Sequence, residues 1–276
     1  MLALLGVLSF VAALALTRLL VTRFAGFALD EPNARSMHSH PVPRTGGIAV
    51  LGAAALCLGF GALPSWLPLG LALVLAAVSF ADDVRGVPTV LRLSIHVGAA
   101  AVLVWYLLSP MNPFGMVLLV LAVAWITNAY NFMDGSDGLA GGMGVIGFAA
   151  YAAGALMAGG AALAAASLAL AAACAGFLVY NYHPARIFLG DVGSIPLGFL
   201  AAGLGLQGWR DDLWPLWFPL LVFGPFIADA TVTLLRRLAR RERIWWAHRE
   251  HYYQRLARMG FGHRGTALLG YGAMLA

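Results

Sequence analysis

The chain has 276 residues, of which 61% are hydrophobic and only 11% are charged. Because a soluble domain has about 45–50% apolar and about 25% charged residues, this composition excludes an ordinary soluble globular protein. The net charge of +5 comes from arginines alone, since the chain has no lysine. These arginines are spread over loops beside apolar segments, which favours contact with a membrane surface over binding of nucleic acid.

Long apolar segments follow one another along the chain. We expect membrane-spanning helices over residues 2–22, 46–63, 67–80, 91–108, 113–128, 139–158, 161–180, 194–208 and 214–235, and a last one that opens near residue 265. Their unbroken apolar runs favour an all-α helical bundle over a barrel of alternating strands. The pattern predicts one integral membrane domain over residues 1–276 with about ten spanning helices, and a cytoplasmic or interfacial loop over 236–264. The last segment is too short to cross a bilayer alone, which indicates a truncated chain or a missing closing helix.

The arginines predict the orientation of the bundle. Sixteen of the 17 lie in one alternate set of loops or in helix ends beside it, and only Arg210 lies in the other set. By the positive-inside rule, the first set is cytoplasmic and the N-terminus is periplasmic. The arginine-rich segment 236–243, which Trp245 and Trp246 follow, predicts an interfacial helix on anionic headgroups that either anchors the protein or also contacts substrate.

Two of the expected cytoplasmic loops pair acidic groups with arginine. In the first loop, Gly46 and Gly47 open the next helix, and free N–H groups there with Arg35 and Arg44 nearby suit an oxyanion such as phosphate; a simple orienting turn is the alternative. His38 and His40 are weak evidence for a metal site. In the second loop, Asp82 and Asp83 are adjacent on a helix end and cannot share a face, so we expect different roles for them. One would hold a divalent cation while the other acts as a base or an electrostatic guide, unless both form a solvated helix terminus.

The third and fourth loops carry oxygen donors. The third contains Asn128, Asn131, Asp134 and Asp137, which suit Mg²⁺ and the hydroxyl and amide groups of a nucleotide. In the fourth, Asp191 lies between two glycines immediately before a helix, as a ligand for a hard cation would. Phe188, three residues earlier, could stack on a base.

The fifth loop holds His248 and His251, whose spacing would place both on one side of a helix. Contact with a phosphate or a leaving group is more plausible than a zinc site, which needs further ligands. Asp229, within the ninth apolar segment, needs a partner at that depth, and an arginine is one candidate.

Five motifs in this order resemble the polyprenyl-phosphate N-acetylhexosamine-1-phosphate transferases, which form glycosyltransferase family 4. The resemblance covers residues 33 to 258. It is carried by Pro32-Asn-x-Arg-Ser-x-His38 with Pro41-x-Pro-Arg-x-Gly-Gly47, by Asp82-Asp83 followed by Arg92-Leu93, by Asn128-x-x-Asn131-Phe-Met-Asp134-Gly-x-Asp137-Gly, by Phe188-x-Gly190-Asp191-x-Gly193-Ser194, and by His248-x-x-His251-Tyr-Tyr-Gln254-Arg255-Leu. The fifth loop lacks the His-His-His-x-Glu run of the phospho-MurNAc-pentapeptide branch. It looks more like enzymes that initiate O-antigen or similar surface polysaccharides.

The resemblance implies a Mg²⁺-dependent enzyme, with Mn²⁺ as a substitute, in the bacterial inner membrane. It would transfer an N-acetylhexosamine-1-phosphate from a UDP-sugar to undecaprenyl phosphate on the cytoplasmic face, releasing UMP, and it would form a homodimer. The residues that this implies are Asp82 and Asp83 for catalysis, Asp191 and Asn131 for the metal, and Asp134, Asp137, Phe188, Arg44, Arg92, His248 and His251 for the substrates. Which aspartate is the base, and which N-acetylsugar is transferred, stay open.

Two other classes of function compete with the enzyme. A transporter for an anionic solute would need polar groups near the middle of the membrane and on its outer side, where Asp229 is the only plausible interior charge. A membrane scaffold would not need three acidic motifs at one mouth.

Overall fold

The computed structural model describes residues 1–31, 40–59, 66–243 and 248–276. It confirms an all-α membrane protein. Two antiparallel strands of two residues each, β1 (Leu29–Asp30) and β2 (Val42–Pro43), form a short ribbon beside the helices. The helices are α1 (Leu2–Arg23), α2 (Gly46–Gly59), α3 (Trp66–Arg85), α4 (Thr89–Leu108), α5 (Pro113–Phe132), α6 (Leu139–Met157), α7 (Ala161–Asn181), α8 (Asp191–Arg210), α9 (Trp217–Val222), α10 (Gly224–Ala239), α11 (Tyr252–Leu256) and α12 (Gly262–Leu275), with a π-helical turn η1 (Ala257–Phe261) before α12.

Six helices among the described residues are long and apolar enough to cross a membrane. They are α1, α3, α4, α5, α6 and α7, and α2 is a shorter apolar helix. The first eight expected segments each coincide with one helix to within a few residues. The full set of about ten spans and the orientation in the membrane stay predictions.

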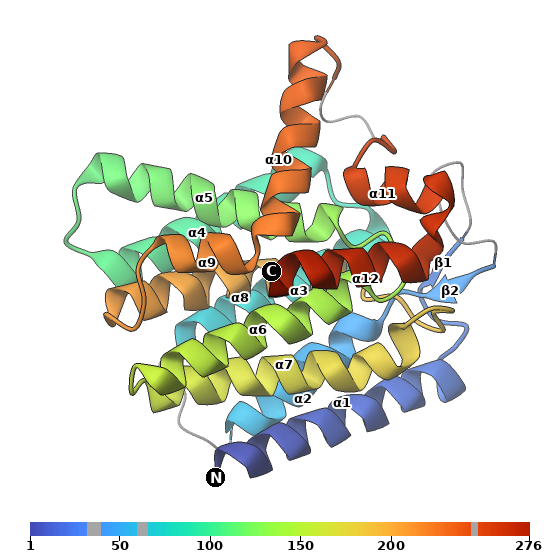
Figure 1. The fold of residues 1–276 in the computed structure, drawn as a ribbon, viewed down its shortest axis with the longest axis horizontal. Helices are drawn as coiled ribbons and strands as arrows, with labels where there is room; N and C mark the ends of the chain where they lie inside the picture. The colour runs from blue at the N-terminus through green and yellow to red at the C-terminus, as the bar shows by residue number, and fades with distance from the viewer. Residues whose placement is uncertain (32–39, 60–65, 244–247) are drawn as a thin grey trace.

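The central helix of the bundle is α8. Every residue from 192 to 208 is buried, and α8 packs against α3 and α5, while α6, α7 and α1 pack side by side on another flank. Most helices run nearly parallel to the long axis of the molecule, and the N-terminus lies at the end opposite the β1–β2 ribbon (Figure 1). The ends that the sequence assigns to the Asp-rich loops therefore gather at the end of the bundle beside this ribbon.

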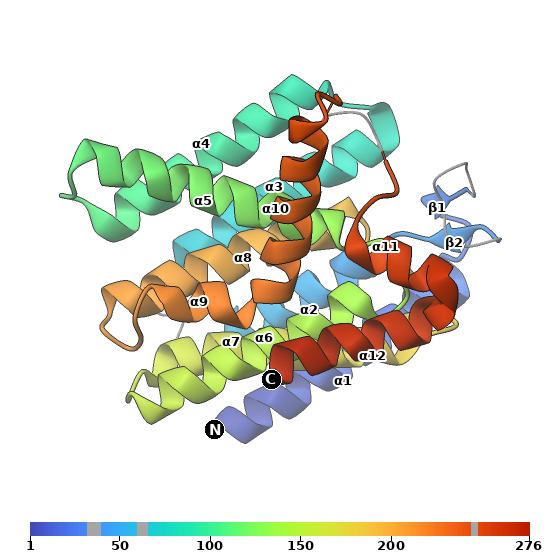
Figure 2. The ribbon, with the colours of Figure 1, turned by 45° about the horizontal axis from the view of Figure 1, so that its top comes forward.

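The ninth segment is not the single span expected over residues 214–235. It breaks at Phe223 into α9 and α10, and α10 stands across the direction of the other helices (Figure 1, Figure 2). The physical reason is Pro225, which has no backbone N–H to continue the hydrogen-bond ladder of α9 and is well placed in the first turn of a new helix. This break brings α10 beside α11 and α12.

Much of the segment 236–264, which the sequence predicts as a loop, is helical in the structure. Helix α10 continues to Ala239, α11 and η1 fill residues 252–261, and α12 begins at Gly262, three residues before the expected opening. Helix α12 packs along α6, which places the end of the described chain against the bundle.

Candidate active site

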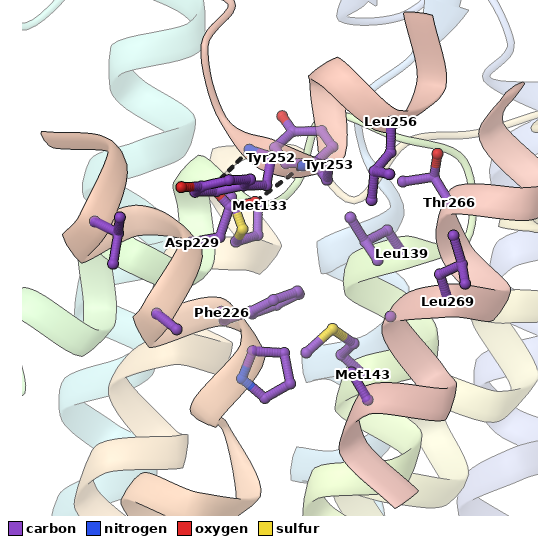
Figure 3. A pocket seen from close by; sticks show the side chains of 15 residues that line it. Met133, Leu139, Met143, Phe226, Asp229, Tyr252, Tyr253, Leu256, Thr266 and Leu269 are labelled. Atoms are coloured by element: carbon purple, nitrogen blue, oxygen red, sulfur yellow. Dashed lines mark hydrogen bonds between the residues drawn. The ribbon is translucent and has the colours of Figure 1, made fainter. Parts of the chain in front are cut away.

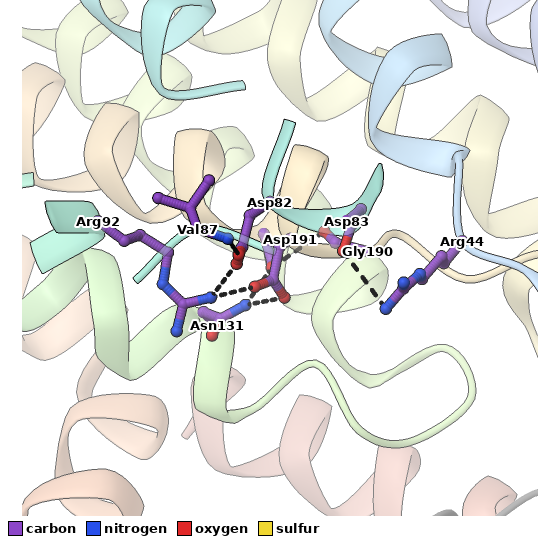
Figure 4. A network of polar contacts seen from close by, with 9 residues as sticks. Arg44, Asp82, Asp83, Val87, Arg92, Asn131, Gly190 and Asp191 are labelled. Carbon is purple, nitrogen blue, oxygen red and sulfur yellow. Dashed lines mark hydrogen bonds and ion pairs between the residues drawn. The ribbon is translucent and has the colours of Figure 1, made fainter. Parts of the chain in front are cut away.

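Three helix ends place Asp82, Asn131 and Asp191 around one arginine. The Nη1 atom of Arg92 lies 2.5 Å from Oδ2 of Asp82 and 3.3 Å from Oδ2 of Asp191 (Figure 4). The Nδ2 group of Asn131 donates to the other oxygen of Asp191 at 2.8 Å. The structure thus brings together the residues predicted for catalysis and metal binding, although they are up to 109 positions apart in the sequence.

The neighbouring Asp83 has a different partner. Its Oδ1 lies 3.3 Å from Nη1 of Arg44, which comes from the first loop on the other side of the site (Figure 4). Asp82 meanwhile also accepts from the backbone N–H of Val87 at 2.6 Å, at the end of α3. The two acids point to separate partners, as the geometry of a helix requires for adjacent positions. Their individual roles stay a prediction.

The first loop is fixed to the fourth by backbone hydrogen bonds. The N–H groups of Gly46 and Gly47 donate to the carbonyls of Phe188 and Leu189, each at 2.9 Å. The prediction that these N–H groups are free to bind an oxyanion was therefore wrong, because backbone carbonyls of the segment before Asp191 already accept hydrogen bonds from them. Arg35 and His38 lie outside the described residues.

Small residues allow this close approach. A Cβ atom on Gly47 would collide with the backbone of Gly193 near the start of α8, so the first turns of α2 and α8 are in direct contact. Gly190 adopts φ +71°, a left-handed conformation that disfavours other residues, and it lies against the carbonyl of Arg44. These contacts place Arg44 next to the turn that presents Asp191.

Asp191 is held at the first position of α8 with its side chain about one-third exposed. Asn131 links it to Ser194, to which its Nδ2 group also donates at 2.8 Å. On the third loop, burial raises the pKa of Asp134 well above its ordinary value, the charge of Asp191 adds to this effect, and a backbone hydrogen bond from Gly190 opposes it. Asp134 therefore shares the electrostatic environment of Asp191.

Asp137 is turned to a different group of residues. Its Oδ2 accepts from Nδ1 of His183 at 2.7 Å and from the backbone N–H of Ala185 at 3.1 Å. The imidazole of His263, at the start of α12, stacks on that of His183 with ring centroids 5.5 Å apart. Neither histidine could be predicted as a partner of Asp137, since nothing in the spacing of residues 137, 183 and 263 connects them.

Asn181 was also missed, and it ties the third loop to the fourth. Its side chain is only 4% exposed, its Oδ1 accepts from the N–H of Gly138 at 3.2 Å, and its Nδ2 donates to the carbonyl of Ile187 at 2.9 Å. A carboxamide can satisfy a donor and an acceptor at once, which a carboxylate cannot. Its place close to His183 and Pro184 in the fourth loop was the available signal.

Phe188 is partly buried, and its backbone is held on both sides by the first loop. Its N–H donates to the carbonyl of Pro43 at 2.7 Å, and its carbonyl accepts from Gly46. The aromatic ring is thus carried by a fixed backbone two residues from Gly190. Stacking on a base stays a prediction.

The two histidines of the fifth loop do not lie on one helix. His251 caps the start of α11, and its ring is 4.8 Å from that of His248, which lies before the helix. His251 is 5% exposed and its Nδ1 lies 3.1 Å from Oδ1 of Asp229. The partner of Asp229 is therefore this histidine and not an arginine.

The arginine-rich segment is not a continuous interfacial helix. Helix α10 ends at Ala239, and Arg237, which is 7% exposed, forms ion pairs with Glu242 and Glu250. Arg236, Arg240 and Arg241 are exposed, and Arg240 also pairs with Glu250. Trp245 and Trp246 lie outside the described residues.

Within the described ranges, no three His, Cys, Asp or Glu side chains form a group that could hold a metal ion. The oxygen donors of Asp191 and Asn131 nonetheless fit Mg²⁺, which is usually held by one or two carboxylates together with water and substrate phosphates. Arg92 places its positive charge between the carboxylates of Asp82 and Asp191. These donors thus suit a cation whose remaining ligands come from a bound substrate.

Comparisons with known proteins identify the family of the chain. The family model for glycosyl transferase family 4 matches residues 65–209. A Bacillus subtilis protein named "Probable undecaprenyl-phosphate N-acetylglucosaminyl 1-phosphate transferase" is 32% identical over 263 residues, covering 88% of this chain and 74% of the relative. A decaprenyl-phosphate N-acetylglucosaminephosphotransferase of Mycolicibacterium smegmatis is 35% identical, covering 92% and 74%. A phospho-N-acetylmuramoyl-pentapeptide-transferase of Synechococcus sp. is 34% identical, covering 70% and 63%. The chain is a membrane-embedded member of glycosyl transferase family 4.

Proposed function

We propose that this protein transfers an N-acetylhexosamine-1-phosphate from a UDP-sugar to undecaprenyl phosphate, with release of UMP. The observation that carries the proposal is the meeting of Asp82, Asn131 and Asp191 around Arg92 at one end of an apolar bundle. A water-soluble donor can reach such an end from solution, while a lipid acceptor reaches it from the bilayer. We place this end on the cytoplasmic face of the inner membrane because the arginine-rich loops lie there.

The reaction exchanges one phosphoanhydride bond for another. An oxygen of the lipid phosphate forms a bond to the sugar-bearing phosphorus, and the bond from that phosphorus to the bridging oxygen breaks, so that its electron pair leaves with UMP. Phosphoryl transfer of this kind depends mostly on positioning and on neutralisation of charge. Arg92 and Arg44 supply positive charge, and each is about one-third exposed and so within reach of an incoming phosphate.

The acceptor needs little activation. A phosphate monoester has a second pKa of about 6, so it is largely a dianion near neutral pH. A strong general base is not required, and in our proposal Arg44, which Asp83 holds in place, guides the phosphate electrostatically. When bound, Mg²⁺ would neutralise diphosphate charge, with Asp191 and Asn131 holding it and Mn²⁺ as a substitute.

Several finer features of the proposal rest on the resemblance of the motifs. They are the initiation of a surface polysaccharide such as O-antigen, N-acetylation of the sugar, and assembly as a homodimer. The transporter alternative has no support in the site, because Asp229, the interior charge it required, is occupied in binding the start of α11.

The test is release of UMP by the purified protein in detergent with undecaprenyl phosphate and a panel of UDP-N-acetylsugars, with and without Mg²⁺. We expect UMP that depends on lipid and metal, from one donor more than the others, and its loss in Asp191→Asn. The exposed Ser94→Ala variant on α4 is the matched control. No UMP from any donor by folded protein would refute the proposed function.

A further inference from the structure

Asp229 is held in a way that points to a specific task. Its Oδ1 accepts from the backbone N–H of Tyr252 at 2.9 Å and its Oδ2 from that of Tyr253 at 3.0 Å (Figure 3). The Nδ1 atom of His251 lies 3.1 Å from the same carboxylate, whose side chain is about 10% exposed. A carboxylate that accepts two backbone N–H groups at the first turn of a helix is a strong, charge-assisted cap. Asp229 on α10 therefore fixes where α11 begins.

The packing around this cap is open. Helices α6, α10, α11 and α12 enclose a mostly apolar cavity of about 360 Å³, with Phe226 and Leu269 in its wall and Asp229 near one end (Figure 3). Because side chains do not fill this space, close packing does not set the register of α10 against α11. The hydrogen bonds of Asp229 set that register.

The start of α11 in turn supports the third loop. The hydroxyl of Tyr253 donates to the carbonyl of Phe132 at 3.2 Å, and a Cβ atom on Gly135 would collide with that hydroxyl. The ring of His251 stacks on that of Phe132 with centroids 5.9 Å apart. The side chains of Tyr253 and His251 thus cover the chain between Phe132 and Gly135, and Asp229 fixes the backbone that carries them.

We propose that Asp229 is a positioning residue of the transfer reaction. It holds Tyr253 and His251 against Phe132 at the end of α5 and against the turn that follows, and the last turn of α5 presents Asn131 to Asp191. The proposal rests on the proposed function, because it assigns to Asp229 the alignment of that same site. Asp229 itself contacts no reacting group.

A second connection between α10 and the fifth loop provides a comparison. Arg237 pairs with Glu250, which attaches the loop at the residue before His251 but contacts nothing in residues 131–135 among the described interactions. If attachment of the loop were all that mattered, Glu250→Gln would behave like an Asp229 variant. If the register of α10 against α11 matters, Glu250→Gln and the Asp229 variants will behave differently.

The experiment measures both activity and local opening in the full chain in detergent. The variants are Asp229→Ala, Asp229→Asn, Tyr253→Phe and the double variant Asp229→Ala/Tyr253→Phe, with Glu250→Gln and the exposed Leu235→Ala as controls. Because a misplacement of about 1 Å can cost about 100-fold in rate, we expect Asp229→Ala to lower kcat by about that factor. We expect a smaller loss in Asp229→Asn, which keeps one acceptor oxygen, and a KM for the lipid acceptor that changes little. The double variant should be no worse than Asp229→Ala, since the two residues act in series.

Hydrogen exchange separates this proposal from the proposed function. Amides of residues 131–138 should exchange faster in Asp229→Ala and in Tyr253→Phe but not in Glu250→Gln or Leu235→Ala. Unchanged exchange there, or losses that multiply in the double variant, would overturn the positioning role. If the unmodified protein releases no UMP, the proposed function fails, and the exchange data still decide whether Asp229 holds the turn. Should Asp229→Ala not fold, Asp229→Asn and Tyr253→Phe carry the test.

Discussion

Asp82 and Asp191, which belong to different helices, contact the same nitrogen of Arg92, at 2.5 Å and 3.3 Å. The guanidinium group neutralises two carboxylates that would otherwise repel each other in a partly buried site. A divalent cation bound by Asp191 would compete with Arg92 for those oxygens. With that cation bound, Arg92 would be free to contact the phosphates of the substrates.

This relationship predicts opposite effects on metal binding and on turnover. Arg92→Ala should lower kcat/KM by roughly 100-fold to 1000-fold, as expected when one charge-stabilising group is lost. It should at the same time strengthen binding of Mn²⁺, which electron paramagnetic resonance measures without any turnover. Arg92→Lys should retain part of the activity, because lysine keeps the charge but not the planar fork. Weaker Mn²⁺ binding in Arg92→Ala would contradict competition between the arginine and the cation.

A second prediction concerns the buried carboxamide between the third and fourth loops. Asn181→Ala would leave the N–H of Gly138 and the carbonyl of Ile187 without their partner. Each unsatisfied buried group costs about 1–3 kcal/mol, so we expect a loss of stability of about 2 kcal/mol or more. Thermal unfolding in detergent measures it, with the exposed Ser94→Ala as the control. An unchanged Tm would show that water replaces the carboxamide.

A third prediction tests the contact between α2 and α8. Gly47→Ala should destabilise the fold by roughly 1–3 kcal/mol, because the added methyl meets the backbone of Gly193 and not a side chain that can move. Gly98→Ala, on α4, has nothing within 4 Å of the added atom and should raise stability by up to about 1 kcal/mol through helix propensity. Equal Tm values for the two variants would refute the close approach.

The contrast between the predicted and the observed features has a physical basis. Apolar runs predicted the first eight helices well, because their length and their ends at charged loops are local properties of the sequence. The site residues Asp82, Asn131 and Asp191 could be named for the same reason, since each is at the end of such a run. The alternation of helix direction then brings those ends together.

Features that depend on contacts between distant segments could not be predicted. The N–H groups of Gly46 and Gly47 looked free because their acceptors lie more than 140 positions away, at residues 188 and 189. The break at Phe223 had a local signal in Pro225, but the new direction of α10, and hence the partner of Asp229, depends on where α11 packs. The contacts of Asp137 with His183 and His263 had no local signal at all.

The last prediction concerns acid stability and His248. Burial, helped by the charges of His251 and Arg237 and opposed by those of Glu250 and Asp229, lowers the pKa of His248 to about 4. The folded protein therefore keeps this imidazole neutral, whereas the unfolded chain binds a proton near the ordinary pKa of about 6.5. Because the unfolded state then holds more protons, His248 makes the folded state lose stability as the pH falls from about 6.5 to about 4.

Replacing the imidazole with a group that does not titrate should remove this contribution. Tm measured in detergent between pH 7 and pH 4 should fall less steeply in His248→Gln than in the unmodified protein, and the two curves should run parallel above pH 7. His40→Gln is the matched control, because His40 is exposed and should leave the slope unchanged. A steeper fall in His248→Gln would mean that the folded state favours the protonated imidazole. Glu250 and Asp229 would then outweigh the burial of the ring, and the fifth loop would present a cation to the substrate in place of a neutral histidine.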